Sequence, residues 1–146
     1  MKAKEYLLQI RILDTRLKNI EAEIREISEQ SASLRSAWPD GQPHGSGTSD
    51  PTAAKAIKLA DRLQDLQYQQ IEVRSQLWHK RAEIVKVIGM VEDADCERLL
   101  YLRYVDCRQW EEIEDDVHIS RAHLFRKHDE ALGIVEDLLK YKNEIE

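Results

Sequence analysis

The segment from His118 to His128 holds the residues best suited to binding an anion. Arg121, Arg126 and Lys127 fall close together within it, and the segment contains no Asp or Glu. Guanidinium and ammonium groups that project from one side of a helix bind phosphate oxygens through charge-assisted hydrogen bonds. The chemistry predicted for this segment is therefore electrostatic binding of a phosphate-bearing polymer.

Metal binding and catalysis have weaker support in the sequence. The two cysteines, Cys96 and Cys107, make no disulfide framework and fit a reducing compartment. A zinc site that recruited them with His118, His123 and His128 would lack the usual ligand spacing. We find no paired carboxylates in a predicted cleft, no Ser-His-Asp set and no His-Glu-x-x-His motif. We therefore expect no metal, no cofactor and no enzymatic activity.

Composition favours an all-α protein. Hydrophobic residues make up 42% and charged residues 34% of the chain, and glycine and proline are scarce. No apolar run approaches the roughly 20 residues that a membrane-spanning helix needs, and the charged residues at Met1–Glu5 do not resemble a signal peptide. We expect a cytoplasmic protein. Its net charge is -6, so any affinity for a polyanion must come from a local concentration of basic residues.

Two long segments have the 3.5-residue periodicity of coiled-coil helices. The first runs from about Lys2 to Arg35, and the second begins near Thr52. Their apolar positions follow one another at alternating steps of four and three. In the first segment these positions are Tyr6, Ile10, Leu13, Leu17, Ile20, Ile24, Ile27, Ser31 and Leu34, and in the second they are Leu59, Leu63, Leu66, Gln70, Val73, Leu77, Lys80, Ile84, Val87 and Val91. A glycine- and proline-rich loop at about 36–52 separates the segments, so residues 1–91 predict a long antiparallel helical hairpin with a flexible loop.

Residues 92–146 predict a second, helical domain. One helix starts at the acidic residues near Asp93, a short helix runs from Trp110 to Val117, and a last helix begins at Arg121 after the N-cap residue Ser120. Two helices joined by a turn of three or four residues form a helix-turn-helix, whose second helix enters the major groove of DNA.

The helical period predicts which residues of this motif are buried and which are exposed. The core residues expected to hold the two helices together are Ile113, Val117, Ile119, Leu124 and Leu132. On the last helix the side chains expected to face inward are Leu124, Phe125, His128 and Leu132. The expected DNA-binding residues are Ser120, Arg121, Ala122, His123, Arg126 and Lys127.

This part of the chain resembles the helix-turn-helix of sigma factor region 4. It is closer still to a group of small phage and prophage proteins related to the ArpU-type late transcriptional regulators. The resemblance covers Asp93 to Leu132 and rests on Leu102-Arg103-Tyr104, Trp110-Glu111-Glu112-Ile113, Ile119-Ser120, Leu124 and Ala131-Leu132. It implies sequence-specific binding of double-stranded DNA, regulation of phage or prophage genes, and a location in the cytoplasm of a bacterial host cell.

Four positions depart from the pattern of that family. Cys107 stands where a turn glycine is usual, and Gln109 stands where a Ser or Thr N-cap is usual. Glu114 replaces a small alanine. His118 occupies a turn position that usually holds glycine and often requires a positive φ.

Charge leaves three interpretations open. From Asp93 to Leu132 the chain has six basic and eleven acidic residues. The first interpretation is therefore weak, salt-sensitive DNA binding by one copy and stronger binding by a homodimer held through the hairpin. Alternatively, the acidic helix and the hairpin form an interaction module that binds RNA polymerase or another phage protein. A third interpretation is a DNA-packaging recognition subunit of the small-terminase kind.

Overall fold

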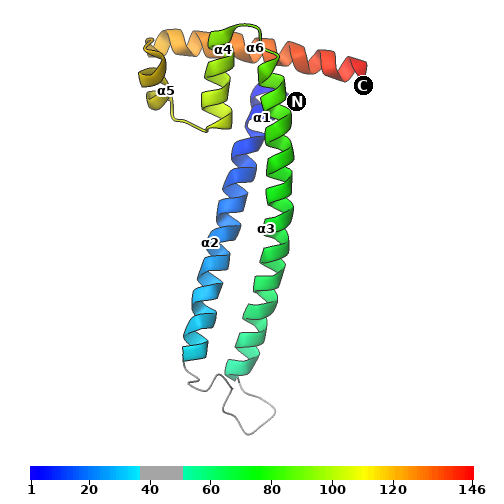
Figure 1. The fold of residues 1–146 in the computed structure, drawn as a ribbon, viewed down its shortest axis with the longest axis vertical. Coiled ribbons are helices and arrows are strands. Elements are labelled where there is room, and N and C mark those ends of the chain that lie inside the picture. Colours follow the sequence, from blue (N-terminus) through cyan, green and yellow to red (C-terminus); the bar gives the residue numbers. More distant parts are fainter. Residues whose placement is uncertain (37–50) are drawn as a thin grey trace. The chain divides into compact units, whose positions relative to one another are not determined.

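The computed structural model of the chain describes residues 1–36 and 51–146, and all the regular structure in these ranges is helical (Figure 1). The all-α prediction is confirmed. The helices are α1 (Ala3–Leu7), α2 (Gln9–Ser36), α3 (Pro51–Gly89), α4 (Ala94–Leu100), the π-helical turn η1 (Tyr101–Val105), α5 (Trp110–Val117) and α6 (Arg121–Ile145). The predicted loop at about 36–52 lies, apart from its ends, outside the described residues.

The helices fall into two compact units. One unit is Thr15–Ser75, and the other combines Met1–Asp14 with Gln76–Glu146. The boundary predicted at residue 91 falls inside the second of these units.

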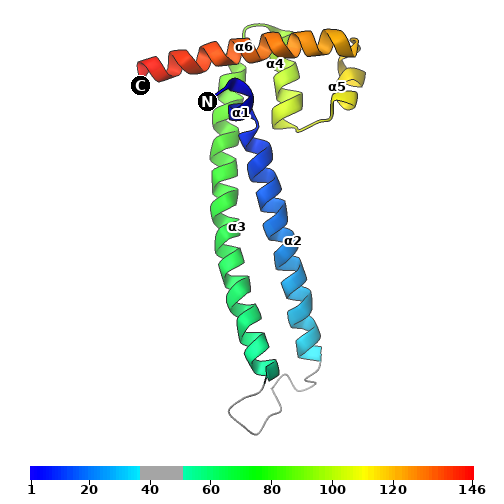
Figure 2. The same cartoon turned by 180° about the vertical axis from the view of Figure 1, so that it is seen from behind.

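The unit Thr15–Ser75 is a hairpin in which α2 and α3 run side by side, as the views in Figures 1 and 2 agree. Its buried residues come from the two predicted apolar rows and include Leu17, Ile20 and Ile27 of α2 with Leu66 and Val73 of α3. Burying one aliphatic side chain of this size contributes roughly 1.5–3 kcal/mol. The apolar contact between the rows is therefore the main source of stability in this unit.

Exposed ion pairs link the same two helices. Arg62 lies 2.7 Å from the carboxylate of Glu23, and Arg74 lies 3.2 Å from that of Glu21. Exposed pairs of this kind contribute about 0–1 kcal/mol each. They support the alignment of α2 with α3 but add little to stability.

The other unit packs α1, the start of α2, the end of α3, α4, η1 and α6 around a shared core. The largest fully buried side chains of this core are Leu7, Ile10, Ile84, Ile88, Leu100 and Val135. At its edge the hydroxyl of Tyr6 donates to Glu83 at 3.0 Å, and Lys80 and Lys142 place their ammonium groups 3.0 and 3.7 Å from the same carboxylate. Glu83 therefore connects α1, α3 and α6 through one charged group.

None of the helices in the described ranges combines the length and the apolar character required to span a membrane.

Candidate nucleic-acid interface

A small apolar cluster holds α5 against α6. Leu99 of α4, Ile113 of α5 and Leu124 of α6 are buried together, and Val117 and Ile119 pack at the edge of this cluster. Four of the five predicted core residues therefore meet as expected. The prediction was wrong for Leu132, which packs against the larger core together with Ala131 and Val135 of the same helix.

The turn between α5 and α6 has the backbone conformation predicted for it. His118 adopts φ 55° and ψ 37°, in the left-handed region, and its amide donates to the carbonyl of Glu114 at 3.0 Å. Cys107, before α5, also has a positive φ, of 54°. Glycine is usual in such turns because a Cβ costs energy in this region. Two positions at which the sequence departs from glycine therefore keep the conformation that glycine favours.

The two helices begin with different caps. Ser120 caps α6, since its hydroxyl oxygen accepts from the amide of His123 at 3.3 Å. Gln109 precedes α5 and makes no side-chain capping bond. The predicted Ser120 cap is confirmed, and it satisfies one of the amides at the start of α6 that has no partner within the helix.

Arg121, the first residue of α6, is held by the acidic helix α5. Its guanidinium lies 3.2 Å from the carboxylate of Glu114 and 3.3 Å from that of Glu111. Glu114 is one of the four departures from the family pattern, so the residue that replaces a small alanine also binds this arginine. The side chain of Arg121 remains about half exposed. It reaches the surface as one partner of an ion pair.

Lys127 is also paired. Its ammonium lies 3.2 Å from the carboxylate of Asp93 and 3.5 Å from that of Glu130. Asp93 caps α4 by accepting from the amides of Asp95 and Cys96, and these bonds, together with Lys127, lower its pKa. Lys127 therefore ties α6 to the start of α4, where only 24% of its side chain is exposed.

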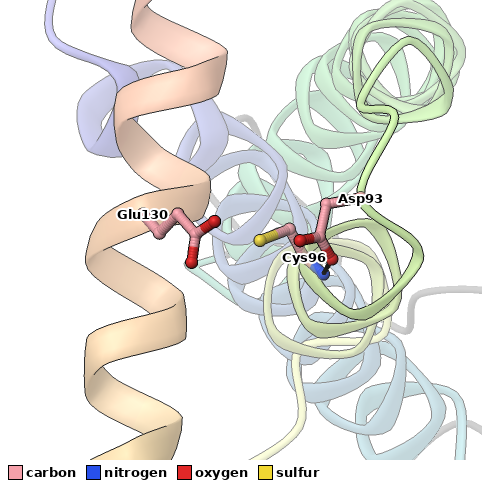
Figure 3. A group of neighbouring side chains, drawn as sticks. All are labelled: Asp93, Cys96 and Glu130. Carbon is pink, nitrogen blue, oxygen red and sulfur yellow. Dashed lines mark hydrogen bonds between the residues drawn. The ribbon is translucent and has the colours of Figure 1, made fainter.

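Asp93, Cys96 and Glu130 come close enough to resemble a metal site (Figure 3). The thiol of Cys96 is buried, and burial raises its pKa, which opposes the thiolate that a metal requires. The ammonium of Lys127 pairs with both carboxylates and offsets part of their charge. A helix cap and two ion pairs account for this cluster.

The exposed side of α6 carries Ala122, Phe125, Arg126 and Asp129, which share one face at helical spacing. His123 is exposed beside them. The prediction that Phe125 faces inward was wrong: 42% of its surface is exposed, and its ring packs perpendicular to that of Trp110, with centroids 5.1 Å apart. Within residues 1–36 and 51–146, Arg126 has no ion-pair partner.

Tyr104 of η1 and His128 of α6 form a buried polar pair. The hydroxyl of Tyr104 and Nε2 of His128 share a hydrogen bond of 2.7 Å, and Trp110 packs edge-on against the imidazole. Burial lowers the pKa of His128 to about 4, although Asp129 acts in the opposite direction. The buried imidazole predicted for His128 is confirmed, whereas its bond to Tyr104 has no signal in the sequence.

Comparison with known proteins gives one result. No curated protein and no solved structure matches the chain. A family model described as "Protein of unknown function (DUF1492)" matches residues 58–136, from near the start of α3 into α6. The match spans more than half of the chain, which therefore belongs to the DUF1492 family.

Proposed function

We propose that this protein binds double-stranded DNA sequence-specifically through the start of α6 and regulates the transcription of phage or prophage genes. The proposal rests on one observation. A turn at His118 and Ile119 joins α5 to a capped α6 whose first turns expose Ala122, Phe125 and Arg126. In helix-turn-helix proteins, side chains at this position of the second helix reach the base edges.

The exposed residues have chemistry that suits a major groove. Arginine forms paired hydrogen bonds with guanine, and Ala and Phe side chains pack against the methyl group of thymine. The amides at the start of α6 add partial positive charge, which favours a phosphate oxygen. Arg126 would thus read or anchor the duplex, and Ala122 and Phe125 would supply apolar contact.

Charge limits what one copy can do. Since Arg121 and Lys127 are each bound to carboxylates, Arg126 is the cation of this segment best placed to meet a phosphate. Each phosphate neutralised contributes about 0.9 to the slope of log affinity against log salt. A single copy should therefore bind weakly, and a homodimer that brings two α6 helices to one duplex should bind much more tightly.

The same ion pairs favour a second candidate function. With Arg121 neutralised, α5 still presents the exposed carboxylates of Glu112 and Asp115. A surface of this kind suits a basic region on another protein, such as RNA polymerase. In this alternative the protein acts as an interaction module and does not contact DNA.

A binding experiment separates the two candidates. Duplexes selected from a random-sequence pool are titrated with wild type, Arg126→Ala and, as the matched control, Lys140→Ala, which alters an exposed cation near the end of the same helix. The DNA proposal predicts that Arg126→Ala weakens binding at least tenfold and that Lys140→Ala changes it less than twofold. If no duplex is enriched at low salt while the wild type binds purified polymerase, the second candidate replaces the first.

A further inference from the structure

Helix α3 carries a second apolar row, distinct from the one that faces α2. Ile57, Gln64, Ile71, Trp78 and Val85 follow one another at intervals of seven residues. Ile71 is 66% exposed and Trp78 is 73% exposed. At 3.5 residues per turn these positions lie roughly opposite the buried row of the same helix. One helix therefore has apolar residues on two opposite sides.

A second set alternates with these positions, each member four residues after one residue of the first set. Its members over the C-terminal half of α3 are Ser75, Ala82 and Gly89, which are all small and exposed. We call Ile71, Ser75, Trp78, Ala82, Val85 and Gly89 together the outer row of α3. A Cβ added at Gly89 would meet no other atom within 4 Å, so this end of the row is open.

The corresponding positions of α2 are different. Opposite its own buried row, α2 carries Arg11, Lys18 and Arg25, separated by Thr15, Ala22 and Glu29. Such a face is suited to water. Since α2 needs no second apolar row to form the hairpin, the hairpin does not account for the outer row of α3.

The exposed apolar area is large enough to matter for association. An aromatic side chain contributes about 150–250 Å² when it is buried, and Trp78, which is 73% exposed, is the aromatic residue of the outer row. A standard interface buries about 800 Å² on each partner. Ile71 and Val85 extend the same face of α3 within the outer row, so the contact is smaller than this standard and predicts a weak dimer.

The sizes of the side chains indicate which partner fits. Large and small residues alternate along the outer row, so a copy of the same row running in the opposite direction sets Trp78 against Ala82, Ile71 against Gly89 and Val85 against Ser75. Parallel rows would instead oppose Trp78 with Trp78 and leave empty layers between such pairs, and layers of this kind do not reach the packing density of a protein interior. A two-fold interface must be self-complementary, and the antiparallel alignment meets this condition.

We propose that two copies of this chain associate through the outer rows of α3, aligned antiparallel with Trp78 of each copy against Ala82 of the other. The proposal names the contact of the dimer invoked under the proposed function, but its test requires no DNA. Failure of the dimer and failure of DNA binding are therefore measured separately.

Analytical ultracentrifugation of the full chain tests the interface. Wild type is expected to sediment at twice the chain mass of 17.1 kDa at 50–100 µM. Ile71→Glu and Trp78→Glu are expected to raise the dimer dissociation constant at least 100-fold while the helical circular dichroism persists. Gln69→Glu adds the same charge at an exposed position of α3 outside the row and should remain dimeric. A monomeric wild type overturns the proposal, as does a dimer that survives both Glu substitutions.

A distance measurement tests the direction. A spin label at Gln64→Cys is introduced in a chain that also carries Cys96→Ala and Cys107→Gly. The antiparallel alignment places the two labels about 48 Å apart, from a helical rise of 1.5 Å per residue. Parallel rows would bring the labels within about 15 Å of each other, near the spacing of packed helices. Pulsed electron resonance distinguishes these distances, and the shorter one would overturn the antiparallel arrangement.

Discussion

The guanidinium of Arg121 lies 3.2 Å from the carboxylate of Glu114, so the first cation of α6 is bound to the helix that precedes it. The pair joins the two helices of the motif at the surface where a duplex would lie. Any phosphate that approached Arg121 would compete with this carboxylate and with that of Glu111. The affinity of the surface for DNA should therefore depend on the acidic residues of α5.

Replacing Glu114 by Gln should raise affinity for DNA. The neutral amide keeps the size of the side chain, leaves Arg121 paired with Glu111 alone and removes a charge that repels phosphate. One added phosphate contact should strengthen binding about three- to tenfold near 0.1 M salt and steepen the salt slope by about 1. Fluorescence anisotropy against a selected duplex measures both. Glu144→Gln, at an exposed position near the end of α6, should leave them unchanged, and an equal effect of the two variants would count against a specific role for Glu114.

The architecture follows from local patterns in the sequence. The two apolar rows predict α2 and α3 because a repeat of 3.5 residues is met only by a helix that buries one side. The cap at Ser120 and the left-handed turn at His118 are equally local, since they depend on a few neighbouring residues. Such features can be assigned from the order of residue types alone.

The charges of the candidate surface could not be assigned in this way. Lys127 pairs with Asp93, which is 34 residues earlier, and this pair exists only because α4 packs against α6. Phe125 sits at a position that the helical period leaves at the border between inside and outside. In the fold its ring packs perpendicular to that of Trp110 of α5, and 42% of its surface stays exposed. Sequence patterns give the helices and their faces, whereas the packing decides which cations stay free.

Replacing His118 by Gly should stabilise the protein. Glycine accepts the left-handed backbone without the steric cost of a Cβ, and this gain exceeds its greater freedom in the unfolded chain. The free energy of unfolding should rise by about 0.5–1 kcal/mol, as measured by urea denaturation. The same substitution at His123, inside α6, should lower it by about 1 kcal/mol. A decrease for His118→Gly would show that the imidazole makes a stabilising contact in solution.

Removing the cap of α6 should have the opposite effect. Ser120→Ala leaves the amide of His123 without its acceptor and should lower the free energy of unfolding by about 1 kcal/mol. Ser120→Asp restores an acceptor and should recover most of this loss. Urea denaturation of wild type and the two variants checks the prediction, and equal stability of Ser120→Ala and Ser120→Asp would mean that the hydroxyl bond contributes little.

Acid should destabilise the protein before its carboxylates titrate. The pKa of His128 is about 4 in the folded protein and near 6.5 in the unfolded chain. Below pH 6.5 the unfolded state takes up the proton first, so stability is complete above pH 6.5 and is lost as the pH falls toward 4. The loss should reach about 3 kcal/mol, at 1.36 kcal/mol for each pH unit.

His128→Gln should remove most of this dependence between pH 6.5 and 4.5, because the amide does not titrate. Urea denaturation at several pH values gives the slopes. His79→Gln, which changes an exposed imidazole on α3, should keep the slope of the wild type. An unchanged slope in His128→Gln would place the pH dependence elsewhere.

Site-directed photo-crosslinking tests the central claim most directly. A benzophenone amino acid is placed at Ala122, on the exposed face at the start of α6, or at Lys140 on the same helix, and each protein is irradiated with a selected duplex. Binding through the start of α6 predicts a covalent adduct with DNA bases from position 122 and none from position 140. A duplex that remains bound but cross-links only from position 140, or from neither position, would contradict it.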